Sequence, residues 1–303
     1  MKKHITIFFG GIDSERAVSL KTVKTVEKYL DSSQYDIARV EVMEDRTWQR
    51  GGKQVGEEIL QWTDYAFIAG HGTYMEDGEL QKILDSHRVP YNGTDALSSK
   101  IAFSKSATKE IFSRYGIQTA VYETHMLDQN LEELAQTIFQ SFPQPCVIKP
   151  DRGGSSCGVA IASTRAAIYD ALTRVAILTD KVIVEEYITG KEATCGVVES
   201  MRDEDVYALP PVEIIPANEF FDYEAKYEGQ VQEICPAGFS DELKSELQDL
   251  ARKVHINLGL SDYSRTDFII HEKKGIYLLE VNTLPDFTEK SDCLLYTSDA
   301  ADD

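Results

Sequence analysis

The sequence predicts three lobes: an amino-terminal α/β lobe with a parallel sheet, followed by two α+β lobes. Two observations carry this prediction. Short β-rich runs alternate with segments of helical periodicity over the first third of the chain, which is typical of a parallel sheet flanked by helices. From about Ile101 onward the order of helices and strands changes, and a glycine- and serine-rich loop interrupts it. We expect the lobes to comprise residues 1–103, 104–188 and 189–291.

The first lobe begins with an apolar run that stops at Gly10 and is predicted to be a strand. A helix should follow, with Ser14 as its N-cap and Glu15 in its first turn, where a carboxylate favours the helix dipole. A later strand ends in Gly70-His71-Gly72, and ligands often bind at such strand ends. The elements predicted for this lobe are strand 5–9, helix 20–30, strands 35–43 and 65–69, and helix 79–86.

The other two lobes are predicted from the same periodicities of apolar residues. The central lobe should contain helices 104–115 and 131–142 and strands 146–149, 159–162 and 182–188. The carboxyl-terminal lobe should contain strands 192–199 and 207–215, helix 241–258 and a hairpin from 266 to 281.

Composition excludes several classes of protein. A chain of 303 residues with 42% hydrophobic content can bury a substantial core. Its formal net charge of −20 would repel nucleic acids and anionic lipids, so we expect neither as a partner. No run approaches the ~18 apolar residues of a membrane span, and the cysteines form no CxxC pair. These features predict a cytoplasmic enzyme without a zinc site or a disulfide framework.

A loop rich in glycine and serine, DRGGSSCG at residues 151–158, follows Lys149 and lies between two predicted strands. Glycines let backbone N–H groups approach a phosphate, and the serines and Lys149 add donors and charge. The spacing is neither that of a Walker loop nor that of a dinucleotide fingerprint. A phosphate cradle and a flexible hairpin loop are therefore both compatible with this segment.

The predicted hairpin near the carboxyl terminus carries a set of oxygen donors. Asp267 heads one strand, and Glu280 and Asn282 lie on one face of the next. Such donors favour Mg²⁺, which bridges nucleotide phosphates, and Arg265 would add a cation where charge develops during phosphoryl or acyl transfer. A solvated hairpin with ordinary charges is the alternative interpretation. The apolar run 276–279 favours the metal site because it leaves Glu280 only partly exposed.

Other polar groups are ambiguous by themselves. A strand ending in Glu185-Glu186 could bind an adenine amino group or ribose hydroxyls, but paired acids at a strand exit are common. The same ambiguity applies to His71-Gly72 with Glu76-Asp77-Gly78, and to Ser14-Glu15-Arg16 at a helix start.

Together and in this order, the motifs resemble those of the D-alanine:D-alanine ligase family of the ATP-grasp superfamily. The resemblance spans roughly residues 5–291, and its matching stretches are FFGGIDSERAVSL, AGHGTYMEDGELQ, VPYNGTDALSSKIAFSKSATK, CVIKPDRGGSSCGV, VIVEEYITGKEATCGV, PPVEIIPANEFFDYEAKY and SRTDFIIHEKKGIYLLEVNTLPDFTEKS. It implies an ATP-grasp fold, a homodimer and an ADP-forming reaction. That reaction joins two D-alanines through a D-alanyl phosphate, for peptidoglycan precursor synthesis.

The resemblance also implies a nucleotide site with two metal ions. Two Mg²⁺ or Mn²⁺ ions would be held by Asp267, Glu280 and Asn282, and the loop 153–158 would cover the phosphates. The residues that it implies as contacts of ATP are Lys105, Lys149, Ser156, Glu185, Glu186, Ile188, Glu192 and Lys226.

For the first D-alanine, the resemblance implies that Glu15 receives the ammonium group and that His71 lies close to it. Tyr227, in a loop expected to close over the site, would link to Ser155 and Glu15. Closure of such a loop would exclude water from an acyl-phosphate that water can hydrolyse.

For the second D-alanine, the resemblance implies that Ser291 binds the carboxylate, while Arg265 and the backbone N–H of Asp286 form the oxyanion pocket. The family motif has glycine where this chain has Asp286, so a position expected to need a permissive backbone carries a carboxylate. Two further departures are Met75 in place of glycine and Ser104 in place of aspartate.

Residues 292–303 fit none of the predicted elements. Their sequence, DCLLYTSDAADD, resembles translated sequencing-adaptor read-through. We therefore expect a non-native tail, a gene that continues past about Ser291, and the loss of the family's final helix. A native acidic tail is the alternative interpretation.

Two other functions remain open on the sequence. An ATP-grasp ligase could use D-serine, D-lactate or an L-amino acid as acceptor; Tyr227 favours D-alanine over a hydroxy acid, whereas Asp286 leaves the acceptor open. The chain could also be an inactive, ATP-binding truncation product. A carbohydrate- or nucleic-acid-binding module has only scattered aromatic residues and a contrary charge to support it.

Overall fold

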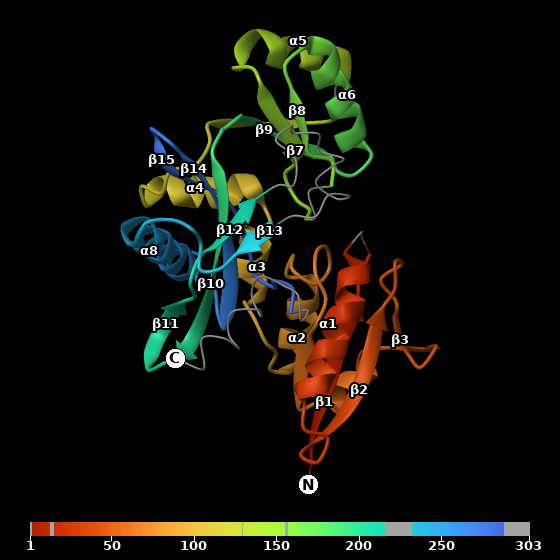
Figure 1. The fold of residues 1–303 in the computed structure, drawn as a ribbon. Helices are drawn as coiled ribbons and strands as arrows, with labels where there is room; N and C mark the ends of the chain where they lie inside the picture. Colours follow the sequence, from red (N-terminus) through yellow and green to blue (C-terminus); the bar gives the residue numbers. More distant parts are fainter. Residues whose placement is uncertain (1, 13–14, 129, 155–156, 216–231, 288–303) are drawn as a thin grey trace.

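Three β-sheets organise the part of the chain that the computed structural model describes, which leaves out residues 1, 13–14, 129, 155–156, 216–231 and 288–303. Each sheet forms the centre of one lobe (Figure 1). The amino-terminal lobe is red to orange, the central lobe is yellow-green to green, and the carboxyl-terminal lobe runs from blue-green to blue. The combination of an α/β lobe with two α+β lobes is as the sequence predicted.

The amino-terminal lobe contains a five-stranded sheet in the order β4-β3-β2-β1-β5. β1 pairs in parallel with β2 and β5, which confirms the predicted parallel sheet, whereas β3 and β4 form an antiparallel edge that was not predicted. The elements are β1 (Lys3–Gly10), α1 (Arg16–Tyr29), β2 (Tyr35–Val42), β3 (Trp48–Arg50), β4 (Lys53–Val55), the 3₁₀ helix η1 (Glu57–Gln61), β5 (Tyr65–Ile68), α2 (Glu79–His87) and α3 (Ala96–Ala102).

Helices cover both faces of this sheet. Val23 of α1 packs with Ile7 on one face, and Leu80 of α2 packs with Phe8 on the other. A strand buried on both faces needs no polar alternation, which explains the continuous apolar run of β1. At the end of that run Gly10 has a φ of +96°, and a Cβ there would lie 2.5 Å from a backbone oxygen of β2, so glycine is required.

The central lobe contains a four-stranded antiparallel sheet in the order β6-β9-β7-β8. Ile148 and Val184 belong to the core that this sheet forms with α5 and α6. Side chains alternate along a strand, so their neighbours Lys149 and Glu185 lie on the opposite face. The elements are α4 (Lys105–Arg114), β6 (Tyr122–Met126), α5 (Leu131–Ser141), β7 (Cys146–Pro150), β8 (Ala160–Ala162), α6 (Arg165–Ala176) and β9 (Lys181–Glu186).

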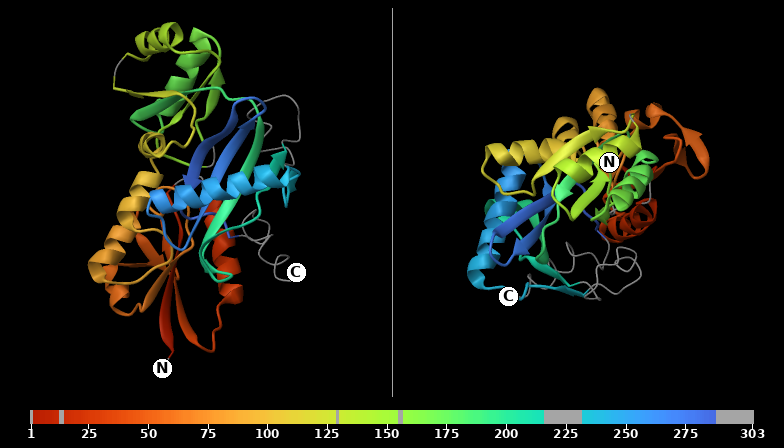
Figure 2. Two further views of the ribbon diagram at one scale, coloured as in Figure 1. Left: turned by 90° about the vertical axis from the view of Figure 1, so that its left-hand side faces the viewer. Right: turned by 90° about the horizontal axis from the view of Figure 1, so that it is seen from above.

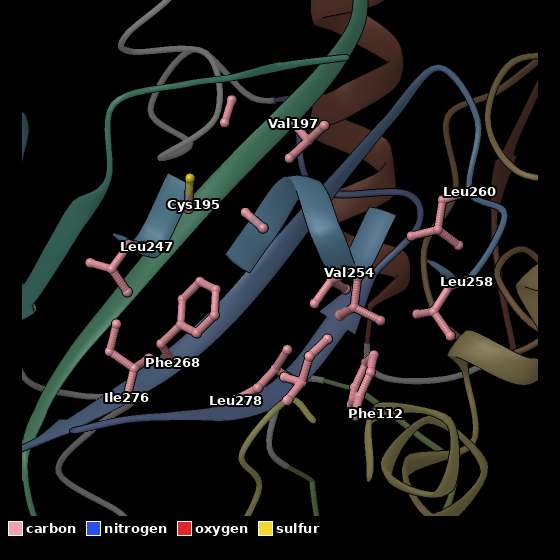
Figure 3. Packing of buried hydrophobic residues seen from close by; sticks show 14 of the residues in the cluster. Phe112, Cys195, Val197, Leu247, Val254, Leu258, Leu260, Phe268, Ile276 and Leu278 are labelled. Carbon is pink, nitrogen blue, oxygen red and sulfur yellow. The ribbon is translucent and has the colours of Figure 1, made fainter. Parts of the chain in front are cut away.

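The carboxyl-terminal lobe contains a six-stranded antiparallel sheet in the order β13-β12-β10-β14-β15, with β11 paired to β10. The long helix α8 lies across one face of this sheet (Figure 2). Leu247 and Val254 of α8 pack with Phe268 and Leu278 of the sheet, and Phe112 of α4 joins the same core (Figure 3). The elements are β10 (Lys191–Met201), β11 (Glu204–Ala208), β12 (Val212–Ile215), β13 (Gln232–Ile234), α8 (Asp241–Asn257), β14 (Tyr263–His271) and β15 (Gly275–Asn282).

Two predictions were wrong in detail. The single strand predicted over residues 207–215 is divided between β11 and β12, because Pro210 and Pro211 cannot donate to a ladder. Glu15 precedes the helix instead of lying in its first turn, since α1 begins at Arg16; the predicted N-cap Ser14 lies outside the described residues. Among the described helices, none is long and apolar enough to cross a membrane.

Candidate active site

A pocket of about 380 Å³ is lined by residues of both the amino-terminal lobe and the large sheet of the carboxyl-terminal lobe. Glu76 also lines this pocket. The residues that were predicted from the sequence as site residues and that line the pocket are Glu15, His71, Glu192, Arg265, Asp267, Glu280, Asn282 and Asp286.

One face of the large sheet forms the floor of the pocket. The strand register places Asp267 opposite Glu280 and Arg265 opposite Asn282. Side chains directly opposite one another in an antiparallel pair share a face, so the strands bring these four groups together. The register shifts next to Asp267, and such a bulge can turn consecutive side chains to one face. Leu279 and Glu280 accordingly both line the pocket.

Asp267 is held by three neighbouring side chains. Arg265 donates to it through Nε and Nη2, each at 3.0 Å. Thr194 Oγ1 donates to Asp267 Oδ1 at 2.6 Å, and Asn282 Nδ2 donates to Oδ2 at 3.2 Å. A bidentate pair of this kind fixes both partners. Arg265 therefore presents its positive charge at a defined place in the pocket wall.

Lys105, the first residue of α4, connects the pocket to the glycine-rich loop. Its Nζ lies 3.2 Å from Glu280 Oε2 and donates to the backbone oxygen of Gly153 at 2.8 Å. Burial opposes ionisation of Glu280, but the positive charges of Lys105, Lys149 and Arg265 outweigh it and lower the pKa of Glu280 to about 2. Glu280 is thus a carboxylate at neutral pH.

The glycine-rich loop also approaches Glu15. A Cβ on Gly154 would lie 2.6 Å from Glu15 Oε1, so a larger residue at this position would displace the carboxylate. The loop is therefore placed between Lys105 on one side and Glu15 on the other.

Lys149 and Glu185 form a buried ion pair that has a third member, Lys109. Glu185 is 2% exposed; its Oε2 lies 2.9 Å from Lys149 Nζ, and its Oε1 lies 3.1 Å from Lys109 Nζ. Burial raises the pKa of Glu185, but the two lysines outweigh burial and lower it below its ordinary value. Both lysines also interact electrostatically with Glu280, so this triad and the pocket belong to one charged cluster.

His71 links the loop after β15 to helix α1. Its Nδ1 lies 2.8 Å from the backbone oxygen of Leu284, and its Nε2 lies 3.0 Å from Thr22 Oγ1, which donates to Asp286 Oδ1 at 3.0 Å. A carbonyl oxygen can only accept, and the hydroxyl of Thr22 has a single proton. Nδ1 of His71 therefore donates to the carbonyl oxygen of Leu284.

Asp286 occupies its position without left-handed backbone strain, because it is absent from the residues with positive φ. The expectation that this position needs the permissive backbone of glycine is therefore wrong. The hydrogen bond from Thr22 directs one carboxylate oxygen of Asp286 toward α1.

Glu76 holds the same loop and was not predicted as a site residue. Its Oε1 accepts from the backbone N–H of Leu284 at 2.9 Å, and its Oε2 accepts from that of Gly72 at 2.8 Å. Burial, followed by the negative charge of Glu15, raises the pKa of Glu76 to about 8. Its position shortly after His71 was the only sequence signal for a role in the site. Its contact with Leu284 could not be inferred, since the two residues are 208 positions apart.

Asp267, Glu280 and Asn282 supply oxygen donors that suit Mg²⁺ or Mn²⁺. They lie on one face of the hairpin and line one pocket. Over the described ranges, no group of three or more His, Cys, Asp and Glu side chains could hold a metal ion. Two carboxylates and an amide would therefore share the ion with water or nucleotide oxygens, as Mg²⁺ sites commonly do. The residues present fit the metal that the resemblance implies.

The remaining predicted residues have different surroundings. Glu192 lines the pocket from β10, and Ile188 is buried against Tyr277. Glu186 lies outside the pocket lining, and its Oε1 accepts from the backbone N–H of Val121 at 3.0 Å. The predicted residues that lie outside the described part of the chain are Ser155, Ser156, Lys226, Tyr227 and Ser291.

Known proteins match this chain over most of its length. The family model described as D-ala D-ala ligase C-terminus matches residues 111–300. The D-alanine–D-alanine ligase of Bacteroides fragilis is 36% identical over 305 residues, which cover 96% of this chain and 92% of the relative. That of Geobacter sulfurreducens is also 36% identical, over 95% of this chain and 85% of the relative.

Solved structures share the fold. The VanG D-Ala:D-Ser ligase from Enterococcus faecalis superimposes with a TM-score of 0.83 at 27% identity, covering 96% of this chain and 93% of that chain. The D-alanine–D-alanine ligase from Bacillus anthracis complexed with ATP gives a TM-score of 0.77 at 29% identity, over 99% and 92%. The fold is thus the predicted ATP-grasp fold, and the chain belongs to the D-alanine–D-alanine ligase family.

Proposed function

We propose that the protein joins two D-alanines to D-alanyl-D-alanine, with conversion of ATP to ADP and phosphate, for peptidoglycan precursor synthesis. The pocket supports this most directly, because Arg265 lies beside the carboxylate of Asp267 on one face of the hairpin, and Lys105 of α4 pairs with Glu280 on that face. In the first step the carboxylate of one D-alanine attacks the γ-phosphate of ATP, and ADP leaves as the D-alanyl phosphate forms. The amine of the second then attacks the D-alanyl phosphate, and phosphate leaves.

ATP is proposed to lie between the lobes of residues 104–188 and 189–291. Lys105 and Lys149 would neutralise its phosphates beneath the glycine-rich loop. Glu186 would contribute from the end of β9, where one oxygen of its carboxylate accepts from the backbone N–H of Val121. The other residues proposed to contact the nucleotide are Ser156, Glu185, Ile188, Glu192 and Lys226.

Asp267, Glu280 and Asn282 are proposed to hold two Mg²⁺ or Mn²⁺ ions. When bound, such ions neutralise charge on the phosphate oxygens. The low pKa of Glu280 supports this role, because a metal ligand must be deprotonated. Arg265, fixed by Asp267, adds a permanent cation beside them.

The amino acids are proposed to occupy the end of the pocket nearest the amino-terminal lobe. Glu15 would receive the ammonium group of the first D-alanine, with His71 close by. Arg265 and the backbone N–H of Asp286 would stabilise the negative charge that develops on the acyl oxygen. These groups position the reactants and neutralise charge, and the loop residues Ser155, Tyr227 and Ser291 keep the roles that the resemblance implies.

A different acceptor is the second candidate. Asp286 places a carboxylate in the wall of the pocket, and a carboxylate can accept a hydrogen bond from the hydroxyl of serine. One of the similar structures is named a D-Ala:D-Ser ligase. D-serine as the second amino acid is therefore the alternative that an observation favours.

An assay of ADP release with identification of the product tests both candidates. D-alanine alone is expected to give ADP and D-alanyl-D-alanine in equal amounts. A mixed dipeptide from D-alanine with D-serine, and none from D-alanine alone, would favour the alternative. In that case Asp286→Gly, which restores the family residue, should remove the preference for D-serine. Absence of ADP release with every amino acid would contradict a ligase function.

We also propose that the protein is a cytoplasmic homodimer, because the family resemblance implies one. Light scattering should then give about twice the chain mass of 34.0 kDa.

A further inference from the structure

Helix α4 connects charged groups of two lobes. Lys105 and Lys109 are four residues apart and therefore lie on the same side of the helix. Lys105 Nζ lies 3.2 Å from Glu280 of the large sheet, and Lys109 Nζ lies 3.1 Å from Glu185 of the central sheet. One helix thus presents a cation to each of the two sheets.

Of the charged residues in these two ion pairs, Lys109 alone has no proposed contact with a substrate or metal ion. It is 1% exposed, and its Nζ lies 5.7 Å from the ring centre of Tyr122. Its Nζ is directed at Glu185 and Tyr122, and Lys109 is not among the residues that the resemblance implies as contacts of ATP. Any influence on a ligand must therefore pass through its partner, Glu185.

Neutralising Glu185 does not by itself require Lys109. Glu185 Oε2 already pairs with Lys149 at 2.9 Å. A further buried cation has to be removed from water, and burial accordingly lowers the pKa of Lys109, although Glu185 counteracts this. Lys109 is thus a second cation on a carboxylate that Lys149 already neutralises.

We propose that Lys109 is a positioning residue for the nucleotide. By binding Glu185 Oε1, it leaves only Oε2 for Lys149, so that Lys149 keeps donors for the phosphates of ATP. It also places a further positive charge next to Lys149, which favours a polyanion. Without Lys109, both oxygens of Glu185 would be available to Lys149 and would draw it away from the phosphates. This inference rests on the proposed ATP site.

Lys109→Met tests the inference, since methionine keeps the length of the side chain and removes the charge. We expect the dissociation constant for ADP and the KM for ATP to rise about tenfold, the loss expected for one charged hydrogen bond. The KM for D-alanine should stay within about twofold. Arg114→Met is the matched control, because it removes an exposed cation from the same helix; it should bind ADP like the unmodified protein.

A double-mutant cycle with Glu185→Gln tests whether Lys109 acts through Glu185, and Lys109→Arg, which keeps the buried charge, covers the case in which Lys109→Met does not fold. If Lys109 acts through Glu185, adding Lys109→Met to Glu185→Gln should change ADP affinity by less than about twofold. Lys109→Arg, which keeps the charge, should bind more tightly than Lys109→Met.

Two results would overturn the assignment. One is a Lys109→Met protein with a lower melting temperature and unchanged ADP affinity, which would make Lys109 a stabilising residue alone. The other is an equal loss of ADP affinity when Lys109→Met is made in the unmodified protein and in the Glu185→Gln variant. By contrast, an unmodified protein that binds no ADP would refute the proposed function itself, which distinguishes the two failures.

Discussion

At the scale of single residues, two glutamates of the site differ in charge because their surroundings differ: Glu280 is ionised and Glu76 is neutral. Glu280 is ionised because Lys105, Lys149 and Arg265 outweigh its burial, and its pKa falls to about 2. Glu76 is buried near Glu15 instead, and its pKa rises to about 8. The site therefore has a permanent anion at the proposed metal position and a neutral carboxyl group beneath the loop after β15.

Glu280→Gln should abolish ligation, because the amide removes the negative charge that the metal ions need. We expect turnover to fall by at least about 100-fold, the upper range for groups that tune a metal site. Circular dichroism should show an unchanged fold. Glu272→Gln, in the exposed turn of the same hairpin, is the control. Full activity of Glu280→Gln would disprove the metal assignment.

Glu76→Gln should change how stability depends on pH. The pKa of Glu76 is about 8 in the folded protein against 4.5 for an ordinary glutamate, so the folded state keeps a proton that the unfolded chain releases between these values. The free energy of unfolding therefore falls as pH rises through this window, by up to about 1.4 kcal/mol per pH unit. Glutamine does not titrate, so the variant should gain stability relative to the unmodified protein as pH rises.

Urea unfolding at about pH 5 and about pH 8 measures this difference. Glu44→Gln, at an exposed position, should follow the unmodified protein at both values. Parallel pH profiles for Glu76→Gln and the unmodified protein would show that Glu76 is not protonated in the folded state.

Some residues of the site could be predicted from the sequence and others could not. Asp267, Glu280 and Asn282 were predictable because strand alternation and a short hairpin fix their relation locally. Lys109 and Glu76 were not, because Glu185 and Leu284, which give them their roles, are distant in sequence. Neither residue type nor spacing indicates such contacts.

At the scale of elements, the loop after β15 is anchored at Leu284, where both the backbone N–H and the carbonyl make hydrogen bonds to side chains of the amino-terminal lobe. The N–H of Leu284 donates to Glu76, and its carbonyl accepts from His71. Thr22 of α1 then connects His71 to Asp286 two residues further on. The proposed oxyanion donor therefore depends on side chains of the amino-terminal lobe.

Thr22→Val should loosen this loop while keeping the shape of the side chain. Loss of a hydrogen bond to a charged group should raise the KM for D-alanine about tenfold, with the KM for ATP unchanged. Thr25→Val is the matched control, because Thr25 lies on the same helix and, among the described residues, its hydroxyl bonds only to the backbone oxygen of Lys21, at 3.5 Å. An equal effect of both substitutions on the two KM values would contradict the role of Thr22.

Long elements were predicted well and short ones poorly. The helix predicted at 241–258 and the hairpin at 266–281 agree with α8, β14 and β15 within a few residues, because many periodic positions define them. β3, β4 and β13 each have three residues, too few for a period. They form through pairing with longer neighbours.

At the scale of the whole molecule, the pocket exists only because separate lobes meet. Glu15 and His71 come from the amino-terminal lobe, and Arg265 and Glu280 come from the large sheet. The sequence predicted the lobes but not their junctions. Phe112 of α4, for example, packs in the core of the large sheet although the predicted boundary at residue 104 assigned α4 to the central lobe.

The central claim is that the reaction passes through a D-alanyl phosphate, and an isotope experiment tests it most directly. D-alanine labelled with heavy oxygen in its carboxylate is supplied with unlabelled ATP, and the released phosphate is analysed by mass spectrometry. Attack of the carboxylate on the γ-phosphate predicts one labelled oxygen in each phosphate. Dipeptide formation with unlabelled phosphate would contradict the acyl-phosphate mechanism.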